Sequence, residues 1–327
     1  MSQRLSLALE PGGLVLPESG AIAVFHPTES HDLSALPKDR VLIAQPFRPG
    51  HDHFAAQGYA CHAALPEGTR AAAAVVFLPR AKPLARALVA EAASVTDGPV
   101  LIDGAKTDGI DSILKELKKR AAPSAAISKA HGKIFWIEGA ELSDWRAAAA
   151  EAEGFTTAPG VFSADGIDPA SQLLAQTLPH KLGRRVADLG AGWGYLSAHI
   201  LKRGSVEKLH LVEANHTALD CARINVQDAR AQFHWADARD WKAPEPLDAV
   251  VMNPPFHTTR AAEPALGQAF IAAAARLLTP SGRLWMVANR HLPYEVPLAE
   301  KFAKVEELAG GNRFKVLLAE RPKRSRR

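Results

Sequence analysis

The sequence predicts an α/β protein with two tandem domains, residues 1–150 and 151–327, each with a mainly parallel sheet covered by helices. Its 327 residues exceed one average domain and suit two of about 150 residues each. Short apolar runs alternate with helix-like segments through both halves, which is typical of β-α-β units. Glycine and proline cluster around 154–169, after a segment at 140–153 that we expect to be helical, so the boundary is predicted near this cluster.

The first half contains four apolar runs that predict strands and two segments that predict helices. The strands are expected at 41–46, 73–79, 100–104 and 134–139, and the helices near 82–95 and 109–121. After the first run, residues 47–53 stand where a nucleotide-binding domain would carry a multi-glycine turn, and Gly50 is the one glycine there. We therefore expect this half to bind no dinucleotide and no adenosyl cofactor.

The second half repeats the alternation with more segments. Strands are expected at 184–190, 208–214, 231–236, 247–253 and 283–289, helices at 195–204, 216–229 and 263–278, and a final hairpin from 305–309 and 313–320. This series again predicts a sheet with helices on both faces.

The composition is that of a globular protein able to bury full cores, with 47% hydrophobic and 23% charged residues. The two cysteines, Cys61 and Cys221, lack the spacing of a disulfide framework or a cysteine-rich zinc site. No window reaches the roughly 18 apolar residues of a membrane span, and no secretory leader is recognisable, so we expect a cytoplasmic protein without membrane contact. His51 and His53 form an isolated pair in an expected surface loop, so no metal is predicted.

Basic residues gather at the end of the chain, although the net charge is only +4. Five of the last seven residues are basic: Arg321, Lys323, Arg324, Arg326 and Arg327. Such a tail suits a polyanion such as RNA, and it is equally compatible with a solvated terminus.

A glycine turn joins a strand to a helix in the second half, in the order Asp188-Leu-Gly190-Ala191-Gly192-Trp-Gly194. Glycines at such a junction let the backbone approach a ligand, and the amides at the start of the helix face it. A dinucleotide fingerprint would need glycine or alanine at the position of Tyr195. The spacing therefore favours an adenosyl cofactor over NAD.

Acidic residues follow at the ends of the next two predicted strands. Glu213 stands where a carboxylate can accept hydrogen bonds from two ribose hydroxyls, with Ala214 beside it. Asp237, next to Ala238, stands where a carboxylate could accept the adenine amino group. Three acids at successive strand ends predict one shared cofactor site.

The segment Asn253-Pro254-Pro255-Phe256 follows an apolar strand and predicts the catalytic site. A conjugated amino group is a poor nucleophile, so a site must hold its N–H bonds with acceptors while its nitrogen faces the methyl donor. The Asn253 side-chain oxygen and the Pro254 carbonyl can each accept one N–H, and Phe256 can stack on the ring. His257 follows, and the sequence does not decide whether it touches substrate or solvent.

These motifs resemble those of the class I S-adenosylmethionine-dependent amino-methyltransferases, in order and spacing, over residues 185–290. The resemblance implies S-adenosylmethionine as cofactor. It implies a cofactor-binding set of Asp188, Gly190, Ala191, Gly192, Gly194, Glu213, Ala214, Asp237, Ala238 and Asn253.

Three further segments, 162–174, 287–294 and 312–316, resemble the bacterial rRNA guanine-N2 methyltransferases, first the small-subunit (16S) RsmC type and next the RlmG type. This resemblance implies two tandem Rossmann-like methyltransferase domains, of which the N-terminal one is degenerate. It implies that Phe162, Ser163 and Asp168 fold over the cofactor, and that Asn289, Arg313, Phe314 and Lys315 lie near the entering base. The chain departs from that family at Asn312, where glycine is usual, and at the bulky Trp193.

The expected reaction is methyl transfer from S-adenosylmethionine to the N2 amino group of a guanine in rRNA, with 16S rRNA as the expected substrate. The expected partner is ribosomal RNA or a ribosomal subunit, and the expected state is a monomer. The alternatives are a 23S rRNA enzyme, a methyltransferase for a protein glutamine or a DNA adenine, and an RNA-binding assembly factor without catalysis.

Overall fold

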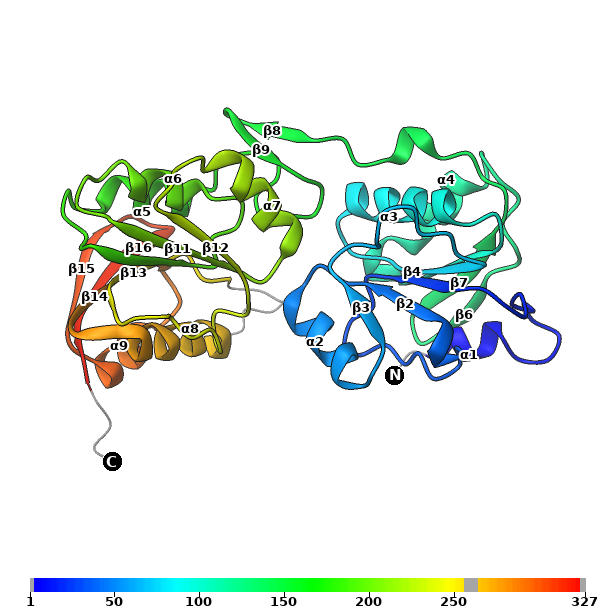
Figure 1. The fold of residues 1–327 in the computed structure, drawn as a ribbon, viewed down its shortest axis with the longest axis horizontal. Coiled ribbons are helices and arrows are strands. Elements are labelled where there is room, and N and C mark those ends of the chain that lie inside the picture. Colours follow the sequence, from blue (N-terminus) through cyan, green and yellow to red (C-terminus); the bar gives the residue numbers. More distant parts are fainter. Residues whose placement is uncertain (1–2, 256–263, 324–327) are drawn as a thin grey trace. The chain divides into compact units, whose positions relative to one another are not determined.

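The structure, a computed structural model, describes residues 3–255 and 264–323. The chain divides into two compact units, residues 1–149 and 150–327, and Figure 1 shows the helices and strands of each. Both units are α/β and each is built on one seven-stranded sheet. No helix in these described ranges is long and apolar enough to cross a membrane.

The first unit begins with a short helix and contains seven strands. Its elements are α1 Arg4–Ala8, β1 Ile22–Phe25, η1 Lys38–Arg40, β2 Val41–Ala44, α2 Arg48–Ala56, β3 Ala60–His62, β4 Ala73–Phe77, α3 Lys82–Val95, β5 Val100–Ala105, η2 Lys106–Asp108, α4 Ile110–Leu117, β6 Ile127–Lys129, β7 Gly132–Ile137 and η3 Ser143–Trp145.

The second unit begins with a small hairpin and then builds its own sheet. Its elements are β8 Ala150–Ala152, β9 Phe155–Thr157, α5 Pro169–Thr177, β10 Arg185–Leu189, α6 Tyr195–Leu201, β11 Lys208–Glu213, α7 His216–Asn225, β12 Ala231–Trp235, β13 Leu247–Met252, α8 Pro264–Leu277, β14 Leu278–Asn289, α9 Glu295–Lys301, β15 Phe302–Gly310 and β16 Phe314–Pro322.

The two large sheets have the same strand order. It is β3-β2-β1-β4-β5-β7-β6 in the first unit and β12-β11-β10-β13-β14-β16-β15 in the second. In each, the first five strands of this order run parallel and the last two pair antiparallel. The carboxyl ends of the five parallel strands therefore meet at one edge of each sheet, where ligands bind in open α/β folds.

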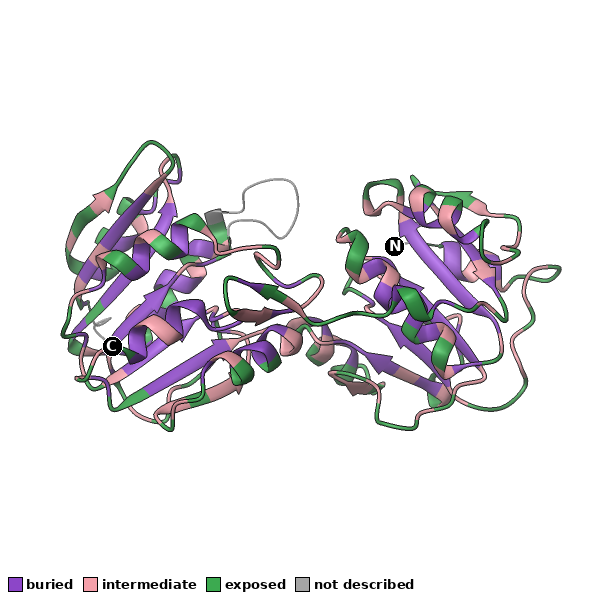
Figure 2. Ribbon diagram, turned by 90° about the horizontal axis from the view of Figure 1, so that it is seen from above, coloured by how far each residue is buried: buried purple, intermediate pink, exposed green. Residues whose placement is uncertain are grey.

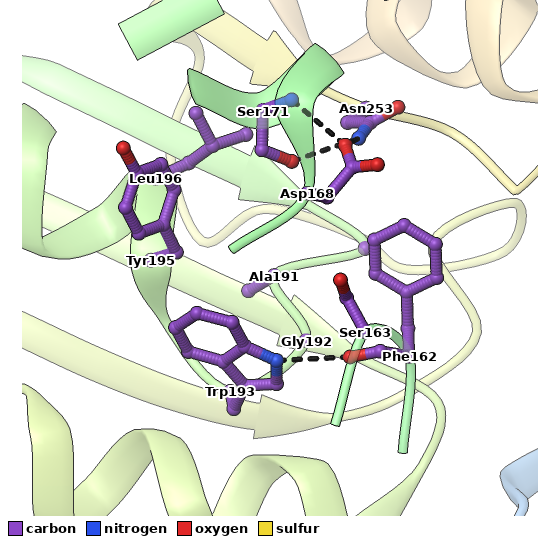
Figure 3. Close-up of a pocket in the computed structure, with 11 residues that line it drawn as sticks. Phe162, Ser163, Asp168, Ser171, Ala191, Gly192, Trp193, Tyr195, Leu196 and Asn253 are labelled. Carbon is purple, nitrogen blue, oxygen red and sulfur yellow. Dashed lines mark hydrogen bonds between the residues drawn. The ribbon is translucent and has the colours of Figure 1, made fainter. Parts of the chain in front are cut away.

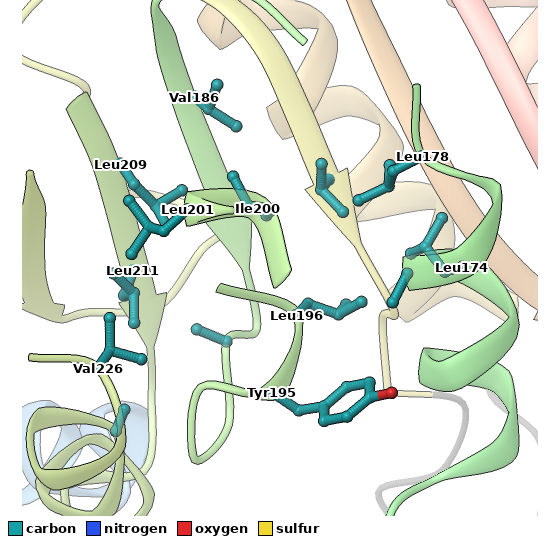
Figure 4. Packing of buried hydrophobic residues seen from close by; sticks show 14 of the residues in the cluster. Leu174, Leu178, Val186, Tyr195, Leu196, Ile200, Leu201, Leu209, Leu211 and Val226 are labelled. Atoms are coloured by element: carbon teal, nitrogen blue, oxygen red, sulfur yellow. The ribbon is translucent and has the colours of Figure 1, made fainter. Parts of the chain in front are cut away.

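The inner strands of each sheet are buried along most of their length, as Figure 2 shows, whereas the outer strands β3, β6, β12 and β15 are partly exposed. In the second unit, α5, α6 and α7 pack on one face and α8 and α9 on the other. Figure 4 shows the first of these cores, where Leu196 and Ile200 of α6 pack near Val186 of β10. Burying these side chains removes apolar surface from water and fixes where α6, and the turn before it, can lie.

The structure corrects three expectations in the first unit and the boundary region. Strand β1, which the sequence did not predict, lies inside the first sheet between β2 and β4 and pairs in parallel with both. Residues 48–56 form helix α2 rather than a loop, because Pro49 occupies the first helical turn, where its missing N–H is tolerated. The expected helix at 140–153 is instead a short 3-10 turn followed by strand β8.

Candidate active site

A pocket lies at the carboxyl edge of the second sheet, and Figure 3 shows its lining. The empty space in and above it, open solvent included, is about 380 Å³. Three segments far apart in the sequence form it: the stretch before α5, the glycine turn with the start of α6, and the end of β13. Its lining residues are Phe162, Ser163, Asp168, Ser171, Gly190, Ala191, Gly192, Trp193, Tyr195, Leu196 and Asn253.

The glycine turn between β10 and α6 has an alternating left-handed backbone. Gly190, Gly192 and Gly194 have φ angles of +76°, +56° and +92°, which L side chains rarely adopt. A Cβ on Gly194 would lie 2.9 Å from the Val226 side chain, whereas one on Gly192 would meet no atom of the described chain within 4 Å. The turn thus packs tightly at its last glycine and leaves an open approach at its middle one.

Trp193 stands within this turn, and its size is accommodated because its side chain packs into the core. Its ring centroid lies 5.2 Å from that of Phe155 and 5.9 Å from that of Tyr195. Its indole Nε1 donates a hydrogen bond of 2.9 Å to the Phe162 carbonyl. This departure from the family's pattern therefore connects the glycine turn to the segment that lines the other side of the pocket (Figure 3).

Asn225, at the end of α7, holds the glycine turn in place through side-chain hydrogen bonds. Its Nδ2 donates to the Trp193 and Thr156 carbonyls, each at 2.8 Å, and its Oδ1 accepts from the Thr156 N–H at 2.7 Å. The contacts join α7, strand β9 and the glycine turn. The sequence predicts no role for Asn225, because asparagine is common near the ends of helices.

Two acids stand beside the turn: Asp188 is fully buried and Glu213 is half-buried. The Asp188 Oδ2 accepts a hydrogen bond of 2.7 Å from the Ser197 hydroxyl, and its Oδ1 has no partner among the described residues. Burial raises the pKa of Asp188 to about 7, against the lowering effect of Ser197, and the nearby Glu213 raises it further. Glu213 accepts from the Gly192 and Asn215 N–H groups at 2.8 and 2.7 Å, and burial raises its pKa too.

Replacing Asp188 with asparagine is expected to flatten the pH dependence of stability in the cofactor-free protein. The folded-state pKa of about 7 exceeds the ordinary 3.8, so the folded state binds more protons between these values. The free energy of unfolding of the wild type therefore falls as pH rises from about 4 to 7, by on the order of 4 kcal/mol at most. Urea unfolding of both proteins between pH 5 and pH 8 measures this, and equal slopes would contradict the burial-raised pKa.

Asp237 lies apart from the pocket lining. Its carboxylate pairs with the Arg239 side chain, with Nε at 2.8 and 3.0 Å from the two oxygens, and Asp237 is mostly buried. Ala238, next to it, is buried, and the Ala214 carbonyl accepts from the Trp235 indole at 2.9 Å. These residues follow β12 and β11, so they lie at the same sheet edge as the pocket without lining it.

Asn253, directly after β13, has its side-chain amide held at one end. Its Nδ2 donates to the Asp168 Oδ2 at 2.9 Å and to the Ser171 hydroxyl at 2.8 Å. Its Oδ1 is buried and has no partner in the described part of the chain. Pro254 is buried and Pro255 is exposed, and Phe256 and His257 lie outside the described residues. The site thus holds an unused hydrogen-bond acceptor.

Asn289 and Phe314 face each other across the β14–β16 pair, beside the end of β13. The Arg313 guanidinium lies 5.2 Å from the Phe314 ring centroid and Arg313 is exposed, so a cation and an aromatic ring stand together. Lys315 is different. It is buried, and its Nζ lies 2.5 Å from the Glu295 carboxylate, so this cation is already paired within the fold.

Ser163 and Phe162 stand at the mouth of the pocket, in the stretch before α5. Ser163 has a φ of +53°, and its hydroxyl donates to the Gly166 carbonyl at 2.7 Å, which stabilises this unusual backbone. The Phe162 side chain is 62% exposed, which leaves a large apolar ring free beside the pocket (Figure 3). Together with Asp168, these residues form the wall opposite the glycine turn.

The first unit can be compared at equivalent positions, because the His26 N–H donates to the Ala44 carbonyl as the Gly190 N–H donates to the Val212 carbonyl. The turn equivalent to the glycine turn therefore begins at His26, not within 47–53 as the sequence predicted. The strand registers then place Val24, His26, Gln45 and Phe77 where the second unit has Asp188, Gly190, Glu213 and Asn253.

The loop from His26 to β2 contains only the short η1 turn where the second unit has α6. At these positions the first unit thus lacks both the two acids and the helix that would face a cofactor. No group of three or more His, Cys, Asp or Glu side chains in either described range could hold a metal ion.

The pocket fits an adenosyl cofactor by its donors and acceptors. The open side of Gly192 admits close approach of a ligand to the backbone, and the Glu213 carboxylate beside it can accept from hydroxyl groups. The unpartnered Oδ1 atoms of Asp188 and Asn253 are buried acceptors that a ligand can satisfy.

Known proteins resemble this chain over most of its length. The family described as Methyltransferase small domain matches residues 153–318. Ribosomal RNA small subunit methyltransferase C of Shewanella sp. (strain MR-4) is 31% identical over 314 residues, which covers 88% of this chain and 91% of that protein. The protein of the same name from Hahella chejuensis is 29% identical over 273 residues, which covers 79% and 80%.

A solved structure is similar across both units. It is described as the T. thermophilus 16S rRNA N2 G1207 methyltransferase (RsmC) in complex with AdoMet and guanosine, and it has 25% sequence identity and a TM-score of 0.79. The match covers 94% of this chain and 90% of that one. The predicted fold class, an α/β protein with two tandem Rossmann-like methyltransferase domains, is confirmed.

Proposed function

We propose, on the premise that this chain belongs to the ribosomal RNA small subunit methyltransferase C family, that it methylates the N2 amino group of a guanine in 16S rRNA. The chain is an S-adenosylmethionine-dependent methyltransferase, and ribosomal RNA is its partner. The nucleotide equivalent to G1207 of the T. thermophilus enzyme's substrate is the first candidate target. A cytoplasmic location and a monomeric state follow as parts of this proposal.

One observation supports the proposal most directly: the Asn253 Oδ1 is buried and accepts no hydrogen bond from the described residues. An exocyclic amino group has two N–H bonds, and its lone pair is delocalised into the ring. The Asn253 Oδ1 and the Pro254 carbonyl at the end of β13 offer two acceptors for those bonds. Holding both bonds keeps the nitrogen facing the methyl donor and favours a tetrahedral nitrogen, whose lone pair is no longer delocalised into the ring.

The bound cofactor supplies an electrophilic methyl group. Glu213 is proposed to accept from the ribose hydroxyls and Asp188 from other donors of the ligand. The N–H groups of the turn's three glycines already donate within the protein, so the turn is proposed to contribute the open backbone at Gly192 rather than hydrogen bonds. The amino nitrogen becomes acidic once methylated and releases its proton to solvent, so the residues of the site need supply no strong base.

Substrate contacts are proposed for Arg313 and Phe314, as an exposed cation and a ring beside the entrance for a base. Lys315 is proposed to support this region through Glu295 instead, since it is buried and paired. The first unit is proposed to stabilise the enzyme or contact RNA, because at four equivalent positions it carries none of the groups assigned above.

The test is transfer of a tritiated methyl group from S-adenosylmethionine to 30S subunits, 50S subunits, free 16S and 23S rRNA, DNA and a release factor. Label in 16S rRNA, free or in 30S subunits, is the expected result. Label confined to 23S rRNA, DNA or protein would contradict the assigned substrate and would leave the amino-methyltransferase chemistry in place.

A further inference from the structure

We infer that Asp168 and Ser171 are positioning residues that hold the Asn253 amide with its oxygen toward the substrate. The inference rests on the proposed function for the role of the Asn253 oxygen. It assigns to Asp168 a contact with the catalytic asparagine, whereas resemblance alone implied a contact with the cofactor.

The two amide hydrogens of Asn253 are both used within the protein. One is donated to the Asp168 carboxylate at 2.9 Å and the other to the Ser171 hydroxyl at 2.8 Å, while Oδ1 lies buried without a partner in the described ranges (Figure 3). Rotating the amide by 180° would place its oxygen against a carboxylate and leave its NH₂ group unbonded. The pair of acceptors therefore selects one orientation.

The local fold makes Asp168 a rigid acceptor. Its Oδ2 also accepts from the Ser171 N–H at 2.8 Å, so Asp168 is the N-cap of α5. Pro169 follows in the first helical turn, where its fixed φ suits a helix start. Ala170 and Leu174 bury the helix in the core, so the carboxylate is fixed by both the cap and the packing of α5.

The contact joins segments 85 residues apart in the sequence. Asp168 ends the stretch that contains Phe162 and Ser163, while Asn253 ends β13. The orientation of the acceptor is thus coupled to the wall of the pocket that lies opposite the glycine turn.

The test exchanges the carboxylate at 168 and the amide at 253 in the full-length protein. Asn253→Asp puts two carboxylates about 2.9 Å apart, where they repel or share a proton. Adding Asp168→Asn restores the pairing of one amide with one carboxylate. The new amide can donate to the carboxylate at 253 while its oxygen caps α5, and the second carboxylate oxygen at 253 stays free to accept from the substrate. The same Asp168→Asn change in the wild type is the matched control.

We expect Asp168→Asn to change kcat in opposite directions in the two backgrounds. In the Asn253→Asp background, Asp168→Asn should raise kcat at pH 8 by about tenfold or more, and should raise the thermal unfolding midpoint. In the wild type the same substitution should lower kcat, because a neutral amide at 168 no longer selects one orientation of the Asn253 amide. The dissociation constant for S-adenosylhomocysteine should change by less than about threefold in each variant, because Asp168 acts through Asn253.

An unfolding midpoint that does not rise in the double variant would overturn the inference. So would a weakened affinity for S-adenosylhomocysteine caused by Asp168→Asn in both backgrounds, since that pattern belongs to a cofactor ligand. The unfolding measurement needs no substrate. If the wild type transfers no methyl group to RNA, the proposed function fails. The thermal unfolding midpoints then still test whether Asp168 and Asn253 are hydrogen-bonded.

Discussion

Replacing Asn253 with alanine is expected to lower kcat for methyl transfer by about a hundred- to a thousandfold, with little change in cofactor affinity. The substitution removes the acceptor that holds one N–H of the amino group, which is the scale of loss seen when one preorganised hydrogen-bonding group is deleted from an active site. Single-turnover rates with 16S rRNA and calorimetric binding of S-adenosylhomocysteine measure the two quantities separately.

Gln172→Ala is the matched control for this variant. Gln172 also carries an amide, lies on α5 beside Ser171, and is exposed, with no part in the contacts of Asn253. Its rate should equal that of the wild type. An Asn253→Ala variant that loses rate and cofactor affinity to the same degree would contradict the assigned role of the asparagine.

Replacing Glu213 with alanine is expected to weaken S-adenosylmethionine binding by about a hundredfold or more. Its half-buried carboxylate is assigned to two ribose hydroxyls, and hydrogen bonds to a charged group are worth about 1.5–3 kcal/mol each. The measurement is equilibrium binding of labelled S-adenosylmethionine at pH 8. The variant also removes the acceptor of the Gly192 N–H, which loosens the middle of the glycine turn in the free protein.

Glu207→Ala supplies the control for Glu213. Glu207 immediately precedes the same strand, β11, at its opposite end, and its exposed carboxylate pairs with Arg184 at 2.6 Å. Its loss should leave cofactor affinity unchanged, because surface ion pairs contribute little. Equal affinities for the Glu213 and Glu207 variants would remove Glu213 from the cofactor site.

The groups that stand at strand ends were predictable from the sequence. Asp188, Glu213 and Asn253 each follow an apolar run, and parallel strands bring their carboxyl ends to one edge, so local patterns were enough to place them. Strand β1 was missed because its four residues give only a brief apolar run among turn residues. That omission also moved the expected position of the first unit's turn from His26 to 47–53.

Contacts between distant segments could not be read from local patterns. The bond from Asn253 to Asp168 spans 85 residues, and that from Asn225 to Thr156 spans 69. Lys315 was expected beside the substrate from its neighbours in sequence, yet β16 alternates its faces, so Lys315 and Phe314 point to opposite sides of the sheet. The register of β14 and β16, which pairs Phe314 with Asn289 and Lys315 with Ala288, shows what surrounds each of these two side chains.

This site is proposed to methylate an exocyclic amino group of guanine. Digesting methylated 16S rRNA to nucleosides and separating them by liquid chromatography against methylguanosine standards, with detection by mass spectrometry, identifies the methylated atom. We expect N2-methylguanosine with the wild type and its near absence with Asn253→Ala. Methyl groups found on a ring nitrogen, on a ribose hydroxyl or on another base would contradict it.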